Sequence, residues 1–241
     1  MTIGVVGGMG SYATLDFFER YLNKFEADKE WDRPRIVIDN RCTMPSRVRA
    51  ILYNERWDQV VSEISDSIGT LIQAGCDNII LACNTSHVFL PDVFKAHPEY
   101  EKYVLHIIKL CAEDIRSKNI TQVTLIATEG TILSRIYQTV FEEYGINVIA
   151  PGEEVFERMR YFIEAVKTNS YTEQLLDDFE SFVLEQAPMP LVLGCTEFPV
   201  IFSKIRSRET IKILDIFDPL ESVLQQLYNR YNDKVKEECQ H

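Results

Sequence analysis

Short apolar runs alternate with longer amphipathic stretches along most of the chain, and this alternation limits the folds it can adopt. Short apolar runs are typical of buried strands, and we expect strands at residues 3–6, 35–39, 78–82, 122–127, 147–150, 191–193 and 211–215. Apolar residues spaced three and four apart predict helices that include residues 13–25, 57–74 and 156–167. Strands that alternate with helices indicate the α/β class, with mainly parallel sheets flanked by helices.

Two of the expected strands end in matching sequences. Residues 79–85 read IILACNT and residues 191–196 read LVLGCT, so each strand leads through a small residue to a cysteine and then a threonine. Two other strands lead into tight polar turns, GGMG at residues 7–10 and TEGT at residues 128–131. This internal symmetry predicts two pseudo-symmetric lobes, residues 1–98 and 99–209, with residues 210–241 returning to the first lobe.

The matched cysteines are the strongest candidates for chemistry. Ligands of open parallel sheets bind outside the carboxyl ends of the strands, so two facing lobes would bring Cys83 and Cys195 into one interlobe cleft. Two acid/base groups on opposite faces of one carbon are what stereochemical inversion requires. A thiol, with an ordinary pKa of about 8.5, can be tuned to act as either acid or base near neutral pH, and backbone N–H groups at a strand-to-helix turn favour the thiolate.

Buried packing is the alternative interpretation of any cysteine at a strand end. Because their contexts match, we assign chemistry to Cys83 and Cys195. The other cysteines lack that context and are predicted to be structural or incidental: Cys42, Cys76, Cys111 and Cys239.

Other motifs are less specific. The glycine turn is not a dinucleotide or P-loop motif, because residue 12 is Tyr and no Gly-Lys-Ser/Thr follows, so we expect its backbone N–H groups to bind a carboxylate. His87 either orients Cys83 as a base or lies in the first helical turn after the strand. No zinc-ligand pair occurs at finger or HExxH spacing, so we expect no metal.

The net charge and the N-terminal residues limit the kinds of ligand and the cellular location that we expect. The chain has 25 Lys and Arg against 37 Asp and Glu, a net charge of −12, which disfavours nucleic acid and requires locally concentrated cations for an acidic substrate. Residues 1–6 carry no basic leader, no apolar run approaches the ~20 residues of a membrane span, and the cysteines form no CxxC pair. We therefore expect a cytoplasmic protein with a small-molecule substrate.

With the GGMG, CNTSH, TEGT and GCTE motifs in this order, the chain resembles the aspartate/glutamate racemase superfamily, and aspartate racemases most closely, over nearly its whole length. The resemblance implies two pseudo-symmetric α/β lobes with the active site between them. It also implies an amino-acid racemase that needs no cofactor, with a homodimer as the expected assembly.

The resemblance also implies roles for individual residues. Cys83 and Cys195 match the two catalytic bases. The matched substrate-binding residues are Met9, Arg47, Asn84, Thr85, Thr128, Lys167, Thr196 and Glu197. Among these, Asn84, Thr85 and Thr196 would hold the α-amino and α-carboxylate groups and Met9 the turn under the substrate. Arg47 and Lys167 would meet the side-chain carboxylate, and an arginine fork can bind a carboxylate bidentately.

Departures from the superfamily pattern bear on specificity. Glutamate racemases carry an aspartate in the glycine turn and a histidine after the second Cys-Thr, where this chain has Met9 and Glu197, which favours aspartate. Ser11 and Tyr12 replace the usual proline and its neighbour, so the rim of the pocket differs. The alternatives are a glutamate, broad-specificity or hydantoin racemase, a maleate isomerase, or a non-catalytic protein that binds an amino acid without α-proton exchange.

Overall fold

The computed structural model describes residues 1–238, which form two four-stranded parallel sheets. The first sheet has the order β2-β1-β3-β4, with β1 at Thr2–Gly7, β2 at Arg35–Asn40, β3 at Asn78–Leu81 and β4 at Val104–Leu105. The second has the order β6-β5-β7-β8, with β5 at Gln122–Ile126, β6 at Asn147–Ile149, β7 at Leu191–Leu193 and β8 at Ile216–Phe217. The same strand order recurs in both halves, and the predicted pseudo-symmetric α/β architecture is confirmed.

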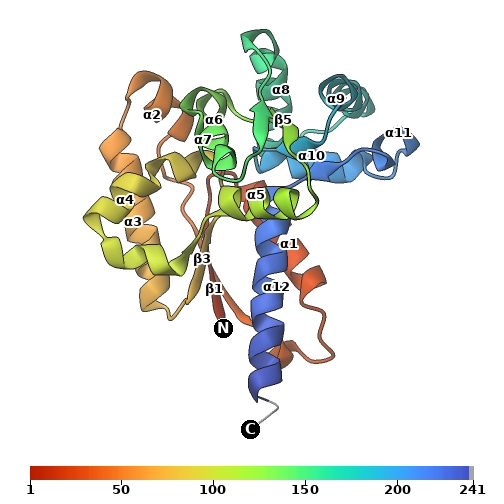
Figure 1. Cartoon of the computed structure of the whole chain (residues 1–241). Helices are drawn as coiled ribbons and strands as arrows, with labels where there is room; N and C mark the ends of the chain where they lie inside the picture. Colours follow the sequence, from red (N-terminus) through yellow and green to blue (C-terminus); the bar gives the residue numbers. More distant parts are fainter. Residues whose placement is uncertain (239–241) are drawn as a thin grey trace.

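Helices flank both sheets (Figure 1). Those of the first half are α1 (Ser11–Lys24), α2 (Arg47–Tyr53), α3 (Trp57–Gln73), α4 (Leu90–Ala96) and α5 (Ile107–Ser117), with 3-10 turns η1 (Glu30–Asp32), η2 (Thr85–Phe89) and η3 (Pro98–Tyr103). Those of the second half are α6 (Glu129–Ser134), α7 (Ile136–Glu142), α8 (Phe156–Lys167), α9 (Glu173–Gln186), α10 (Glu197–Ile205), α11 (Glu209–Lys212) and α12 (Pro219–Glu238), with the 3-10 turn η4 (Glu153–Val155). None of the described helices is long and apolar enough to cross a membrane.

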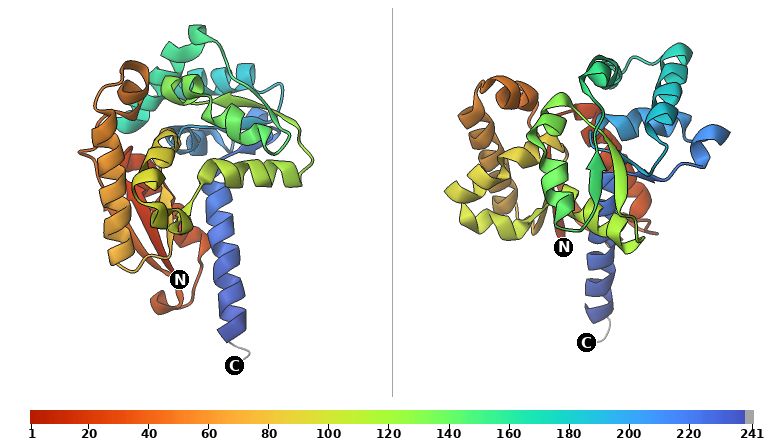
Figure 2. Two further views of the ribbon diagram at one scale, coloured as in Figure 1. Left: turned by 60° about the vertical axis from the view of Figure 1, so that its left-hand side comes forward. Right: turned by 45° about the horizontal axis from the view of Figure 1, so that its top comes forward.

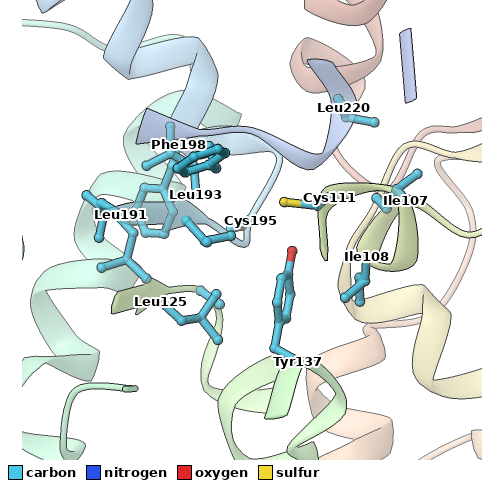
Figure 3. Packing of buried hydrophobic residues seen from close by; sticks show 14 of the residues in the cluster. Ile107, Ile108, Cys111, Leu125, Tyr137, Leu191, Leu193, Cys195, Phe198 and Leu220 are labelled. Carbon is cyan, nitrogen blue, oxygen red and sulfur yellow. The ribbon is translucent and has the colours of Figure 1, made fainter. Parts of the chain in front are cut away.

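One large apolar cluster joins the two halves. It contains Ile3 and Phe17 from the first half and Val123 and Leu125 from the second, all fully buried. Figure 3 shows a part of this cluster around Leu125 and Ile108. A second cluster packs α3 against the outer face of the first sheet, through residues spaced three and four apart such as Val60, Ile64 and Ile68. Because the first cluster is continuous, the lobes are held in a fixed relation, and this relation positions the turns at the strand ends.

The first six expected strands occur with each end within one residue of its predicted position. The strand expected at residues 211–215 is wrong, because Glu209–Lys212 forms α11 and the strand is Ile216–Phe217. Ile211 lies on this short helix and its side chain is buried. The apolar residue that suggested a strand is therefore the buried side of a helical turn. The two-residue strand β4 was not expected, since so short a strand leaves no periodic pattern.

The sheet pairing also differs from the expected division into lobes. β4 adds to the first sheet beyond residue 98, and β8 pairs with β7 in the second sheet, although residues 210–241 were expected in the first lobe. The closing helix does reach the first lobe, because Arg230 Nη1 donates to Asn78 Oδ1 at 2.7 Å. Figure 2 shows α12 continuing past the body of the molecule in both views. Cys239 lies outside the described residues.

Candidate active site

The turns that follow the central strands of both sheets surround one cavity of about 60 Å³. The turn after β1 supplies Met9, the turn after β3 supplies Cys83, and the turn after β7 supplies Cys195. All ten residues predicted for the site line this cavity: Met9, Arg47, Cys83, Asn84, Thr85, Thr128, Lys167, Cys195, Thr196 and Glu197. Residues far apart in the sequence therefore meet at one place between the lobes.

Three further residues line the cavity that the sequence did not single out, namely Ser46, Val48 and Ile163. Ser46 and Val48 flank Arg47, and Ile163 lies one helical turn before Lys167 on α8. Their signal in the sequence was only this proximity to predicted residues, because none of them belongs to a motif.

Cys83 lies in a turn held by backbone contacts. Its carbonyl oxygen accepts hydrogen bonds from Ser86 Oγ at 2.7 Å and from His87 Nδ1 at 3.0 Å, while His87 Nε2 accepts from the Ile107 N–H at 3.4 Å. Burial lowers the pKa of His87 to about 4, so the ring is neutral at pH 7. Both ring nitrogens are used by backbone groups, and this favours the structural interpretation of His87 over a base acting on the Cys83 thiol.

Cys195 is buried and is a hydrogen-bond donor. Its thiol donates to Glu197 Oε2 at 2.9 Å. Burial, the charge of Glu197 and this hydrogen bond raise the pKa of Cys195 well above its usual value, and the nearby Cys83 adds to the rise. The turn was expected to favour a thiolate at this position, but burial and an adjacent carboxylate outweigh the backbone N–H groups and favour the thiol.

Thr196 connects the two cysteine turns directly. Its hydroxyl lies 3.3 Å from the carbonyl oxygen of Ala82, the residue before Cys83, and 3.4 Å from Glu197 Oε2. A single hydroxyl proton is shared between these two acceptors. The contact spans the lobes and holds the ends of β3 and β7 close together.

The glycine turn is shaped by its neighbours. A Cβ at Gly10 would overlap Oε1 of Glu197, so only glycine lets that carboxylate lie against the turn. Gly8 has a φ of +78° and approaches the backbone of Arg41 and Cys42 closely. Its N–H, which we expected to be available to a carboxylate, donates instead to Thr14 Oγ1 at 3.1 Å.

The two expected cations are arranged differently from each other. Arg47 Nη2 donates to the Met9 carbonyl oxygen at 2.7 Å and Nη1 donates to that of Pro45 at 2.9 Å, while Nε is buried without a partner within residues 1–238. The guanidinium thus holds the glycine turn and does not present an open fork. Lys167 is at the exposed rim, where its Nζ donates to Glu164 Oε1 at 2.8 Å.

Lys167 keeps its positive charge in this position. Burial opposes the charge, but the hydrogen bond to Glu164 and the charge of Glu197 raise the pKa of Lys167 above its usual value. The net charge of −12 repels an acidic substrate, so such a substrate needs a cation close to its binding site. Lys167 is a cation at that place.

Hydroxyl and amide groups complete the cavity wall. The hydroxyls of Thr85, Thr128 and Thr131 form a triangle with oxygen separations of 3.0, 2.8 and 2.9 Å. Asn84 Oδ1 accepts from the Tyr137 hydroxyl at 2.7 Å. Thr131 and Tyr137 were not predicted. Thr131 is part of the TEGT motif, which could have indicated it, whereas nothing in the sequence connects Tyr137 with Asn84.

Comparisons with known proteins agree with this geometry. The family model described as Asp/Glu/Hydantoin racemase matches residues 6–226. The broad specificity amino-acid racemase RacX of Bacillus subtilis is 27% identical over 223 residues, covering 88% of this chain and 92% of the relative. Glutamate racemase of Aquifex pyrophilus is 25% identical over 179 residues, covering 73% and 67%. The solved Picrophilus torridus aspartate racemase has a TM-score of 0.79 at 27% identity, covering 96% and 94%.

Proposed function

The chain belongs to the Asp/Glu/hydantoin racemase family, and we propose that it interconverts the enantiomers of aspartate by passing a proton between Cys83 and Cys195. The observation that carries the proposal is that both strand-end cysteines line one small cavity between the lobes. A base on one side of a bound α-carbon and an acid on the other side are sufficient for inversion by proton transfer.

The environment of Cys195 supports an order of events. Cys195 carries a proton, because burial and Glu197 raise its pKa. Cys83 is then the base for the first turnover, and its thiolate removes the α-proton from one face of the substrate. The Cys195 S–H donates its proton to the opposite face. The proton now on Cys83 and the thiolate left on Cys195 serve the reverse reaction.

Charge develops on the substrate between these two transfers. When the α-proton leaves, negative charge spreads from the α-carbon into the α-carboxylate, where preorganised donors stabilise it most effectively. The side-chain amide of Asn84, whose Nδ2 has no partner within residues 1–238, and the hydroxyls of Thr85 and Thr128 are the donors that line the cavity. They require no cofactor to serve in this role.

Aspartate is the proposed substrate for two reasons. Lys167 keeps a positive charge at the rim and Arg47 lines the same cavity, so a second carboxylate finds cationic partners. Met9 and Glu197 occupy the positions where the resemblance gives glutamate racemases an aspartate and a histidine.

We further propose that the protein is cytoplasmic and acts as a homodimer. A measurement of its mass in solution will test the homodimer.

The test is to incubate the purified protein with L-aspartate, without added cofactor, and to resolve the enantiomers by chromatography. Parallel reactions contain L-glutamate and L-alanine. We expect D-aspartate to form fastest. If glutamate or alanine reacts faster than aspartate, the assignment of substrate fails but racemisation stands. Saturable binding of aspartate with no change of configuration would overturn the racemase proposal and favour an amino-acid-binding protein.

A further inference from the structure

A buried tyrosine of the second lobe contacts the cavity wall of the first lobe. Tyr137 lies on α7 and is fully buried, and its hydroxyl donates to Asn84 Oδ1 at 2.7 Å. Figure 3 shows the ring standing among apolar side chains, with the hydroxyl directed toward the side where Cys111 and Cys195 lie. Tyr137 itself does not line the cavity, whereas its partner Asn84 does.

This contact fixes the orientation of the Asn84 amide. The tyrosine hydroxyl has one proton, and within residues 1–238 Asn84 Oδ1 is its acceptor. Burial raises the pKa of Tyr137 well above its usual value, so the hydroxyl keeps that proton. If the amide were flipped, its NH₂ group would face the hydroxyl, and the hydroxyl proton would be left without an acceptor in an apolar environment. A buried donor without an acceptor is destabilising, so the flipped amide is disfavoured.

The fixed orientation determines which end of the amide is available to a ligand. Asn84 is 2% exposed and lines the cavity, and its Nδ2 is buried without a partner within residues 1–238. An NH₂ group only donates hydrogen bonds, so it cannot satisfy a substrate ammonium, which also only donates. A carboxylate oxygen is the substrate group that accepts such a bond.

We infer that Tyr137 is a positioning residue that holds Asn84 with Nδ2 toward the cavity, where it donates to a carboxylate oxygen of the bound amino acid. This inference rests on the proposed function for the identity of the ligand. According to this inference, Asn84 binds a carboxylate of the substrate and not its amino group. Substrate binding by Asn84 in the first lobe then depends on Tyr137 in the second lobe.

The first test is Tyr137→Phe, which keeps the ring and removes the hydroxyl. The Asn84 amide is then free to flip. In the flipped molecules the hydrogen bond from Asn84 Nδ2 to the substrate carboxylate is lost. We therefore expect KM for aspartate to rise about tenfold, with a smaller change in kcat. The matched control is Tyr144→Phe, whose hydroxyl donates to Glu113 Oε1 at the surface, and it should leave both constants unchanged. An unchanged KM in Tyr137→Phe would overturn the inference.

A double-mutant cycle separates positioning from a general structural role. In the Asn84→Ala background the Tyr137→Phe change should have no further effect on KM, because the amide that it orients is gone. A tenfold effect that persists in that background would contradict the inference. Asn84→Asp offers an independent check, because its carboxylate still accepts from Tyr137 but cannot donate. It should raise KM at least as much as Asn84→Ala, and wild-type affinity in this variant would also overturn the inference.

A measurement without turnover keeps this test distinct from the test of the proposed function. The side-chain NH₂ resonances of Asn84 are assigned by their loss from the ¹⁵N–¹H correlation spectrum of Asn84→Ala. We expect them to shift or broaden in Tyr137→Phe and to stay in place in Tyr144→Phe. Unchanged resonances in Tyr137→Phe would overturn the inference even if aspartate is racemised, and absent racemisation by the wild type would overturn only the proposed function.

Discussion

The thiol of Cys195 donates a hydrogen bond to Oε2 of Glu197 over 2.9 Å, with both side chains buried beside the glycine turn. The two cysteines of the cavity are therefore not equivalent, although their local sequences match. A carboxylate next to a thiol disfavours the thiolate, so Cys195 keeps its proton in the unliganded protein. This asymmetry leads to the proposed order in which Cys83 acts first as the base.

Glu197→Gln should change the pH dependence of the reaction. Cys195 must hold a proton to act as the acid, so activity is lost as the pH rises through its pKa. Burial and the Glu197 carboxylate raise that pKa, and replacing the carboxylate with a neutral amide lowers it. The alkaline limb of the kcat/KM profile should thus move to lower pH. Glu209→Gln, which affects a surface ion pair with Lys212, is the control. An unchanged limb or one displaced to higher pH would contradict the assignment.

Lys167→Met should reduce selectivity for an acidic substrate. Removing the rim cation leaves the side-chain carboxylate with Arg47 alone, whose guanidinium already donates to backbone carbonyl groups. The kcat/KM for aspartate should therefore fall about tenfold or more, while that for alanine changes little. Lys212→Met is the matched control, because Lys212 also pairs with a glutamate three residues earlier but lies away from the cavity. Steady-state kinetics with both substrates measure the effect. Equal losses of kcat/KM for aspartate and alanine would show that Lys167 does not bind the substrate side chain.

His87→Gln should flatten the acid sensitivity of folding. The folded-state pKa of His87 is about 4, below the usual 6.5. Below pH 6.5 the unfolded chain takes up a proton that the folded chain resists, so the free energy of unfolding falls as the pH drops from 6.5 to 4. The contribution of His87 between pH 7 and pH 5 is about 2 kcal/mol.

Urea denaturation at pH 7 and pH 5 measures this contribution. The decrease in unfolding free energy between these pH values should be smaller in His87→Gln than in the wild type. The partly exposed His97→Gln serves as the control and should retain the wild-type decrease. If the decrease in His87→Gln equals that of the wild type, the buried neutral ring is not the source of acid sensitivity.

The fold was predictable to the extent that it repeats a simple pattern. Four of the six correctly expected strands, β1, β3, β5 and β7, are buried at the centres of the sheets, where side chains on both faces are covered. The edge strands β2 and β6 are more exposed but also contain short apolar runs, so each of the six is marked by its own residues. β4 and β8 have two residues each, and their pairing depends on where neighbouring helices place them rather than on their own composition. The division of the last segment between lobes was missed for this reason.

The members of the site were predictable, but their partners were not. Parallel strands bring their carboxyl ends to one edge, so motifs at those ends meet whatever their separation in the sequence. Which atoms then touch depends on packing between lobes. The carbonyl groups that Arg47 binds carry no sequence signal, and Tyr137 reaches Asn84 from 53 residues away. Family resemblance selected residues that line one cavity, but it did not show that Arg47 holds the glycine turn.

The central claim is that two bases on opposite faces of the substrate carry out the inversion, and isotope incorporation tests it most directly. L-aspartate is incubated with the protein in D₂O and both enantiomers are analysed at low conversion. The account predicts one solvent deuterium at the α-carbon of the D-aspartate formed and none in the remaining L-aspartate, with no interconversion by Cys83→Ser or Cys195→Ser. Deuterium entering both enantiomers equally from the start, or full racemisation by both serine variants, would contradict it.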